Sequence, residues 1–201
     1  MKVIGLTGSI GSGKSTVANI MRQMGVAILC ADTAAKKVVE KGATAYKKII
    51  KTFGQKVVNK DKSLNRTRLG EIVFSSEAKR KVLNSIVHPE VINELKKEIS
   101  RMETLQRKVV VLDIPLLYEE GLEELCHKVV VVYAPEPMME KRIFLRDNLA
   151  RDEIRKRIAS QLSIEEKKKR ANYVIDNSAD LAKTQSQVEW VLREIMIDSK
   201  E

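Results

Sequence analysis

The sequence predicts an α/β protein built on a parallel β-sheet. Short apolar runs recur along the chain with longer amphipathic stretches between them, and strands that alternate with helices are typical of parallel sheets. Two of these runs, Val109 to Leu112 and Val129 to Val132, are apolar at every position, so both faces of each strand should be covered. At 201 residues the chain can bury one sizeable core and carry a subdomain.

The first elements are predicted to follow one another closely. A strand over Val3 to Thr7 runs directly into glycine-rich sequence. A helix follows from Ser15 until Gly25 ends the pattern, and Val26 to Cys30 forms the second strand. Apolar side chains at helical spacing indicate the helix: Val17, Ile20, Met21 and Met24.

Residues 32 to about 105 are predicted to be mostly helical, with breaks at Phe53–Gln55 and around Asn59–Asp61. A short strand over Tyr173 to Ile175 completes a sheet of five strands. Apolar stripes on the helix that ends the first region and on the closing helix are expected to be buried. Their members are Ile92, Leu95, Ile99 and Met102 in the former, and Leu181, Val188, Val191, Leu192 and Ile195 in the latter.

The net charge of +10 is concentrated late in the chain. Residues 141–170 hold 11 Lys or Arg against 5 Asp or Glu, which gives this segment a charge of +6. An anionic partner such as a nucleotide phosphate fits this pattern. Phe144 is the only aromatic residue there, so the stacking platforms that bind single-stranded nucleic acids are missing.

Composition also indicates the cellular compartment in which the protein works. Cys30 and Cys126 are too few for a disulfide framework, which indicates a reducing, cytoplasmic environment. No apolar run approaches the ~20 residues that a membrane helix needs, and the start of the chain is not expected to be a signal peptide.

The segment Gly8–Ser15 has the pattern glycine, four residues, Gly-Lys-Ser, and it lies between a predicted strand and a predicted helix. Glycines let successive N–H groups turn toward phosphate oxygens, and the helix directs its positive end to the same place. Lys14 should reach the β- and γ-phosphates, and the Ser15 hydroxyl should bind Mg²⁺. This P-loop indicates nucleoside triphosphate binding, which several protein classes share.

The rest of the sequence favours a kinase among those classes. A GTPase should carry an Asn-Lys-x-Asp motif, but the nearest match, Asn59–Lys62, ends in lysine, and no Asp-x-x-Gly switch is present. A small chain with an arginine-rich segment suits a phosphoryl-transfer enzyme whose lid surrounds the transferred group with cations and excludes water. Arg142 and Arg146 are four residues apart, as are Arg151 and Arg155, so each pair should share a helix face. The same spacing separates Arg157 from Gln161.

Four further motifs, together with the P-loop, resemble the dephospho-CoA kinase family over residues 3 to about 195. They are Cys30–Ala35, Leu83–Pro89, Ile114–Glu119 and Tyr173–Ser178. The resemblance implies a P-loop kinase fold with a nucleotide-binding core (1–31, 108–139 and 171–201), a helical dephospho-CoA-binding region (32–107) and a lid (140–170). It implies ATP-dependent, Mg²⁺-assisted phosphorylation of the ribose 3′-hydroxyl of dephospho-CoA, the last step of coenzyme A biosynthesis.

The resemblance also implies roles for individual residues. Asp32 would be the base that takes the hydroxyl proton, although it could instead cap a helix that starts near Thr33. Asp113 would hold Mg²⁺ with Ser15, or else be an ordinary polar residue at a strand end. Arg146 would contact phosphate, while the other cations of its cluster could simply form a solvated face. Cys30 departs from the aspartate that the family often has there.

The remaining expected contacts are with the two substrates. ATP is expected to contact Gly11, Ser12, Gly13, Lys14, Ser15, Thr16 and Asn177. Dephospho-CoA is expected to contact Asp32, His88, Pro115 and Leu116, although His88 could be purely structural and the two others only a wall. No nucleic acid or membrane partner is expected, and the chain should be a monomer or a weak homo-oligomer. A nucleoside monophosphate kinase and an ATP-dependent switch or nucleic-acid-binding protein are the alternatives.

Overall fold

The structure is a computed structural model and describes residues 1–197. The predicted core segment 171–201 therefore extends past the described residues at positions 198–201. The chain divides into two compact units. The first combines Met1–Leu29 with the chain from Met102 onward, and the second is Cys30–Arg101.

A five-stranded sheet in the order β2-β3-β1-β4-β5 forms the centre of the first unit. β1 pairs in parallel with both β3 and β4, and β4 pairs in parallel with β5. The predicted α/β fold with a five-stranded parallel sheet is thereby confirmed. The strands are β1 (Lys2–Thr7), β2 (Ala27–Cys30), β3 (Val109–Asp113), β4 (Lys128–Tyr133) and β5 (Tyr173–Asp176).

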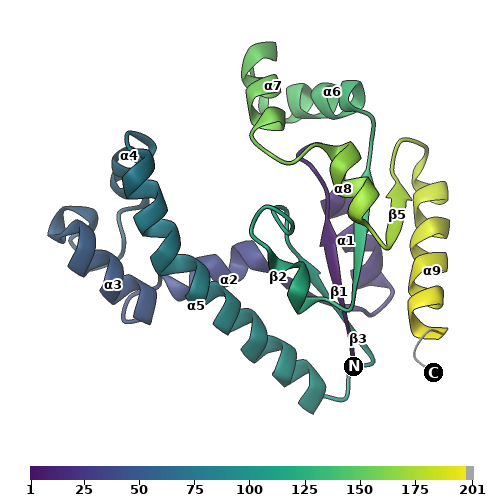
Figure 1. The fold of residues 1–201 in the computed structure, drawn as a ribbon, viewed down its shortest axis with the longest axis horizontal. Coiled ribbons are helices and arrows are strands. Elements are labelled where there is room, and N and C mark those ends of the chain that lie inside the picture. Colours follow the sequence, from purple (N-terminus) through teal and green to yellow (C-terminus); the bar gives the residue numbers. More distant parts are fainter. Residues whose placement is uncertain (198–201) are drawn as a thin grey trace. The chain divides into compact units, whose positions relative to one another are not determined.

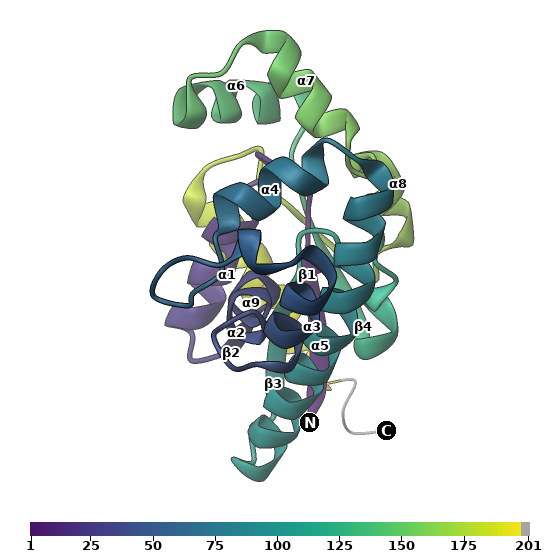
Figure 2. The same ribbon diagram turned by 90° about the vertical axis from the view of Figure 1, so that its left-hand side faces the viewer.

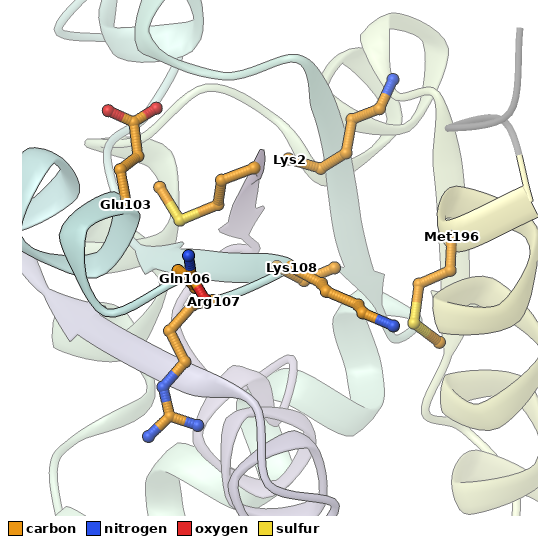
Figure 3. Close-up of a pocket in the computed structure, with 8 residues that line it drawn as sticks. Lys2, Glu103, Gln106, Arg107, Lys108 and Met196 are labelled. Carbon is orange, nitrogen blue, oxygen red and sulfur yellow. The ribbon is translucent and has the colours of Figure 1, made fainter.

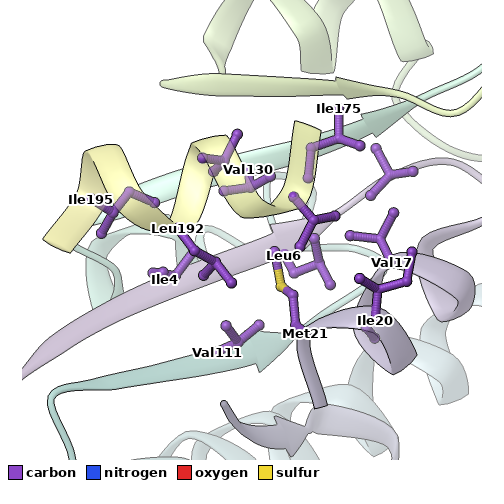
Figure 4. Packing of buried hydrophobic residues seen from close by; sticks show 14 of the residues in the cluster. Ile4, Leu6, Val17, Ile20, Met21, Val111, Val130, Ile175, Leu192 and Ile195 are labelled. Atoms are coloured by element: carbon purple, nitrogen blue, oxygen red, sulfur yellow. The ribbon is translucent and has the colours of Figure 1, made fainter. Parts of the chain in front are cut away.

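Two helices cover one face of this sheet. α1 (Lys14–Gln23) and α9 (Leu181–Ile197) lie side by side, and their apolar side chains meet those of the strands in one core (Figure 4). The strands contribute every second residue to it, as expected for side chains that alternate between two faces. The core comprises Ile4, Leu6, Val17, Ala18, Ile20, Met21, Val109, Val111, Val130, Val132, Ile175, Val188, Val191, Leu192 and Ile195.

Two residues that fit the apolar spacing of α1 and α9 lie outside this core. Leu181 is 61% exposed because it is the first residue of α9, and the first buried position of that helix is Thr184, one turn later. Met24 is 43% exposed because α1 ends at Gln23 and Met24 only caps it.

The other helices of the first unit follow β3 and β4. They are the short 3₁₀-helix η2 (Leu122–Leu125), α6 (Glu136–Asp147), α7 (Arg151–Ala159) and α8 (Ile164–Arg170). α6 and α7 lie beyond the carboxyl ends of the strands, whereas α8 returns to contact β4 (Figures 1 and 2). The predicted lid, residues 140–170, thus takes in most of α6 and all of α7 and α8.

The second unit is helical. Its elements are α2 (Ala31–Val38), α3 (Thr44–Phe53), η1 (Gln55–Val57), α4 (Arg66–Phe74) and α5 (Glu77–Thr104), which continues into the first unit. Both predicted breaks are confirmed, because Gly54 ends α3 with a φ of 80° and a tight turn links Asn59 to Ser63. A separate small core fills this unit, comprising Tyr46, Ile49, Phe53, Val57, Leu64, Leu69 and Val73.

Cys126 and His127 contribute to the packing and hydrogen bonding of the sheet. Burial raises the pKa of the Cys126 thiol to about 12, so it stays protonated at neutral pH. The Nδ1 atom of His127 accepts a hydrogen bond of 3.0 Å from the N–H of Val3, which ties the start of β4 to β1. Among residues 1–197, no helix combines the length and the apolar character needed to cross a membrane.

Candidate active site

The predicted phosphate loop, Gly8–Ser15, links β1 to α1 at the carboxyl edge of the sheet, where parallel α/β proteins bind ligands. At the start of α1 the N–H groups of Thr16 and Val17 both donate to the carbonyl of Gly13, at 2.9 and 3.3 Å. Within the described part of the chain, the N–H groups of Lys14 and Ser15 have no acceptor, as is usual in the first turn of a helix. They form a ready site for an anion.

Two glycines in the loop are required by close contacts. A Cβ atom on Gly8 would lie 2.6 Å from Oγ of Ser12 and 2.7 Å from the carbonyl of Val132. Gly13 has a φ of +91°, and a Cβ atom there would lie 1.9 Å from Nδ2 of Asn177. The loop can therefore adopt this path only without side chains at these two positions.

Lys14 and Asp113 form an ion pair at the centre of the site. Their side chains are only 14% and 13% exposed. The pairing follows from the sheet, because Leu6 lies opposite Asp113 in the parallel register of β1 and β3. The Lys14 ammonium group is thus held beside the first turn of α1, where a phosphate group would need a positive charge.

The residues predicted to bind Mg²⁺ have suitable chemistry. Ser15 presents an exposed hydroxyl and Asp113 a carboxylate, and oxygen donors of this kind are what Mg²⁺ prefers. The part of the chain that the structure describes contains no cluster of three or more His, Cys, Asp or Glu side chains able to hold a metal. Two protein oxygens suit Mg²⁺ nonetheless, because this ion commonly keeps several waters and takes phosphate oxygens as ligands.

Asn177 is buried against the loop. Its Nδ2 atom donates to the carbonyl of Ser12 at 2.8 Å, and its Oδ1 atom accepts a 3.1 Å bond from Oγ1 of Thr184. Its backbone N–H donates to the carbonyl of Tyr133 at 2.8 Å, which fixes the end of β5 beside the end of β4. The side chain of Asn177 thus supports the loop, and its predicted contact with ATP stays a prediction.

The two arginines of α6 have different surroundings. Arg142 donates to the carbonyls of Gly11 and Ser12 at 3.3 and 3.2 Å, and to that of Asn177 at 2.7 Å. Arg146 lies one turn later and forms a two-pronged ion pair with Asp147, at 2.7 and 2.8 Å. This hydrogen-bonded pairing raises the pKa of Arg146 and lowers that of Asp147. The phosphate contact of Arg146 stays a prediction.

A buried lysine joins α8 to the loop that follows β3. Lys167 in α8 is 0% exposed, and its Nζ atom lies 2.9 Å from Oε1 of Glu119 and 3.0 Å from the carbonyl of Pro115. The same Glu119 oxygen accepts a 2.9 Å bond from the N–H of Leu162. Thr7, the last residue of β1, also donates to the carbonyl of Pro115, at 3.0 Å. Pro115, expected to touch dephospho-CoA, thereby anchors α8.

We expect Glu119→Gln to destabilise the protein by about 2–3 kcal/mol, because it leaves the buried Lys167 ammonium group without a counter-charge. Adding Lys167→Met should restore part of this loss, since the pair is then removed together. Urea unfolding of the single and double variants measures both effects. A double variant less stable than Glu119→Gln alone would contradict this account of the pair.

Asp32 and His88 belong to the second unit. α2 begins at Ala31 and its N-cap is Cys30, so the alternative role of Asp32 as a helix cap is wrong. The helix starts two residues earlier than expected because β2 runs into it without a loop. Asp32 is exposed, in the first turn of α2, and its predicted role as the base stays a prediction. His88 is half-buried in α5, next to Pro89.

A pocket of about 680 Å³ opens at the opposite, amino edge of the sheet (Figure 3). Lys2, Lys108 and Val109 at the starts of β1 and β3 line it, together with Met196 of α9. This pocket does not belong to the predicted nucleotide site, because the phosphate loop and Asp113 lie at the carboxyl ends of these strands.

The sequence does not mark two residues that support the site. Lys167 stands in a run of charged residues typical of a solvated face, and nothing in that run indicates that it is buried. The spacing of Arg157 and Gln161 predicts a shared helix, but α7 ends at Ala159, so only Arg157 belongs to it. Gln161 instead meets the phosphate loop, where its side-chain oxygen accepts from Ile10.

The chain is similar to known proteins in both sequence and structure. A family model described as dephospho-CoA kinase matches residues 2–183. A dephospho-CoA kinase from Bacillus licheniformis is 49% identical over 190 residues, which cover 94% of each chain. A crystal structure from Thermus thermophilus superimposes with a TM-score of 0.82 at 37% identity, covering 96% of this chain and 97% of the other.

A solved dephospho-CoA kinase from Campylobacter jejuni has a TM-score of 0.75 at 32% identity, with 98% of both chains covered. The sequence match and the structural match both extend over nearly the whole chain, so they include the phosphate loop, the helical unit and helices α6 to α8. The chain therefore belongs to the dephospho-CoA kinase family.

Proposed function

We propose that the protein transfers the γ-phosphoryl group of ATP to the ribose 3′-hydroxyl of dephospho-CoA, which gives coenzyme A and ADP. The observation that supports this most is the phosphate loop with its Lys14–Asp113 pair, set in a chain of this family. The transfer is direct, from one oxygen to the other, and the protein positions both groups and stabilises the charge on the transferred group.

The phosphate loop holds the donor. The free N–H groups of Lys14 and Ser15 point from the helix end toward the phosphates, and the Lys14 ammonium group neutralises charge on the β- and γ-phosphates. Ser15 and Asp113 would hold Mg²⁺, which would supply positive charge to offset the negative charge that develops during transfer. Gly11, Ser12, Gly13, Thr16 and Asn177 complete the ATP contacts of this proposal.

The acceptor needs a base and a cationic lid. Asp32 accepts the proton of the 3′-hydroxyl and orients its oxygen for in-line attack. Arg146 swings from Asp147 to the transferred phosphoryl group, where its planar guanidinium can bond two oxygens at once. His88, Pro115 and Leu116 line the dephospho-CoA site.

The remaining proposals concern the setting of this reaction. The protein acts in the cytoplasm, and its two cysteines, both free in the structure, suit a reducing compartment. It works as a monomer or weak homo-oligomer and without nucleic acid.

A coupled ADP-release assay tests the function. We expect dephospho-CoA to stimulate ADP formation in the presence of ATP and Mg²⁺, with coenzyme A detected as product by mass spectrometry. AMP, shikimate and RNA serve as competing stimulants and should give only the background rate. Stronger stimulation by any of these three than by dephospho-CoA would overturn the assignment.

A further inference from the structure

We propose that Gln161 is a positioning residue for ATP. Its side chain holds the phosphate loop at Ile10 and lies in the return segment of the lid. The proposal rests on the proposed function only for the identity of the reaction, because it concerns how the loop is held. The return segment is defined here as Gln161 and Leu162, between α7 and α8.

The direct contact is a hydrogen bond into the loop. The N–H of Ile10 donates to Oε1 of Gln161 at 2.9 Å. Only the oxygen of a side-chain amide can accept such a bond, so the contact also fixes which way the Gln161 amide faces. Ile10 is the third residue of the loop, in the stretch that leads to the helix end. Its N–H is thereby occupied by Gln161 and does not bind phosphate in this arrangement.

The return segment is itself held firmly. Leu162, the next residue, donates its N–H to Oε1 of Glu119 at 2.9 Å. Glu119 is in turn paired with Lys167, a fully buried residue in the middle of α8. A buried ion pair is costly to disrupt, so Gln161 is attached to a firmly held segment.

Two parts of the predicted lid contact the phosphate loop. In α6, Arg142 donates to the carbonyls of Gly11 and Ser12. After α7, Gln161 accepts from the N–H of Ile10. The loop backbone is therefore bonded both by a donor and by an acceptor. Any movement of the return segment is carried directly to the loop that positions the phosphates.

Two size-matched variants and a control test this inference. Gln161→Met keeps the length of the side chain but removes the accepting oxygen, whereas Gln161→Glu keeps the acceptor. Gln185→Met makes the same change on the exposed surface of α9, where the side-chain amide of Gln185 donates to Glu189. The first readout is exchange of the Ile10 amide proton, measured by NMR on the full chain without nucleotide. The second is ATP affinity by calorimetry, with no acceptor present.

We expect Gln161→Met to speed Ile10 exchange and to weaken ATP binding by about 2- to 10-fold each, the range for one net hydrogen bond. Gln161→Glu should keep slow exchange, and it is judged by exchange alone because its new charge would itself repel phosphate. Gln185→Met should match wild type in both readouts. In steady-state assays, Gln161→Met should raise KM for ATP and leave KM for dephospho-CoA unchanged.

The outcomes separate this inference from the proposed function. Unchanged Ile10 exchange in Gln161→Met would overturn it, as would faster exchange with unchanged ATP affinity. Neither readout involves dephospho-CoA. A wild-type protein that binds ATP but fails to phosphorylate dephospho-CoA would therefore refute the proposed function and leave the role of Gln161 fully tested.

Discussion

Replacing Lys14 with alanine is expected to lower kcat by about 10²–10³-fold or more, the usual cost of removing one group that stabilises transition-state charge. The ammonium group lies at the head of α1, and in the proposed reaction it neutralises the phosphates during transfer. Its removal has a second consequence, because the Asp113 carboxylate loses its partner while only 13% exposed. An unpaired anion would then face the incoming triphosphate. Steady-state kinetics at saturating ATP measure the combined effect.

The matched control is Lys168→Ala. Lys168 is another lysine of the first unit, but it lies in α8, and its ammonium group stacks 4.4 Å from the centre of the Tyr133 ring. This variant should keep nearly normal turnover. Circular dichroism should show a folded protein for both variants. If Lys14→Ala retained most of the wild-type kcat, the phosphate loop could not be the catalytic one.

The parts of the site that are contiguous in sequence could be predicted from the sequence. The loop, the strand before it and the helix after it lie within residues 2–23, so residue types and hydrophobic spacing specify them together. The fully apolar strands indicated a parallel sheet, and a parallel sheet brings the carboxyl ends of β1 and β3 to one edge. Asp113 could therefore be expected near the loop, although its pairing with Lys14, 99 positions away, depends on the register.

The supports of the site could not be predicted in this way. Lys167 is buried by contacts with Glu119 and the Pro115 carbonyl, which lie about 50 residues earlier and leave no trace in local charge pattern. Gln161 falls just after a helix end that the sequence does not mark. Leu181 shows the converse error, because it fits the apolar spacing of α9 but is the first residue of the helix, where it is 61% exposed.

Asp32→Asn is expected to lower turnover by roughly 10²–10⁴-fold, the range for loss of a general base. An amide cannot take up a proton at neutral pH, whereas it matches a carboxylate in size. In the structure Asp32 is not the cap of α2, so the structural effect left to it is the attraction of its charge to the helix N-terminus. That effect is worth about 0.3–1 kcal/mol at an exposed position. The melting temperature should therefore fall by only a few degrees.

Measured together, kcat, ATP affinity and melting temperature separate the two roles of Asp32. A base predicts a large loss of kcat with ATP affinity unchanged, whereas a purely electrostatic role in α2 predicts a small loss of stability with normal turnover. Cys30→Ala is the companion variant, because Cys30 caps α2 without any side-chain hydrogen bond and stands where the family often has aspartate. It should keep activity close to wild type. A loss of turnover in Cys30→Ala as large as that in Asp32→Asn would mean that the end of β2, and not the Asp32 carboxylate, determines the chemistry.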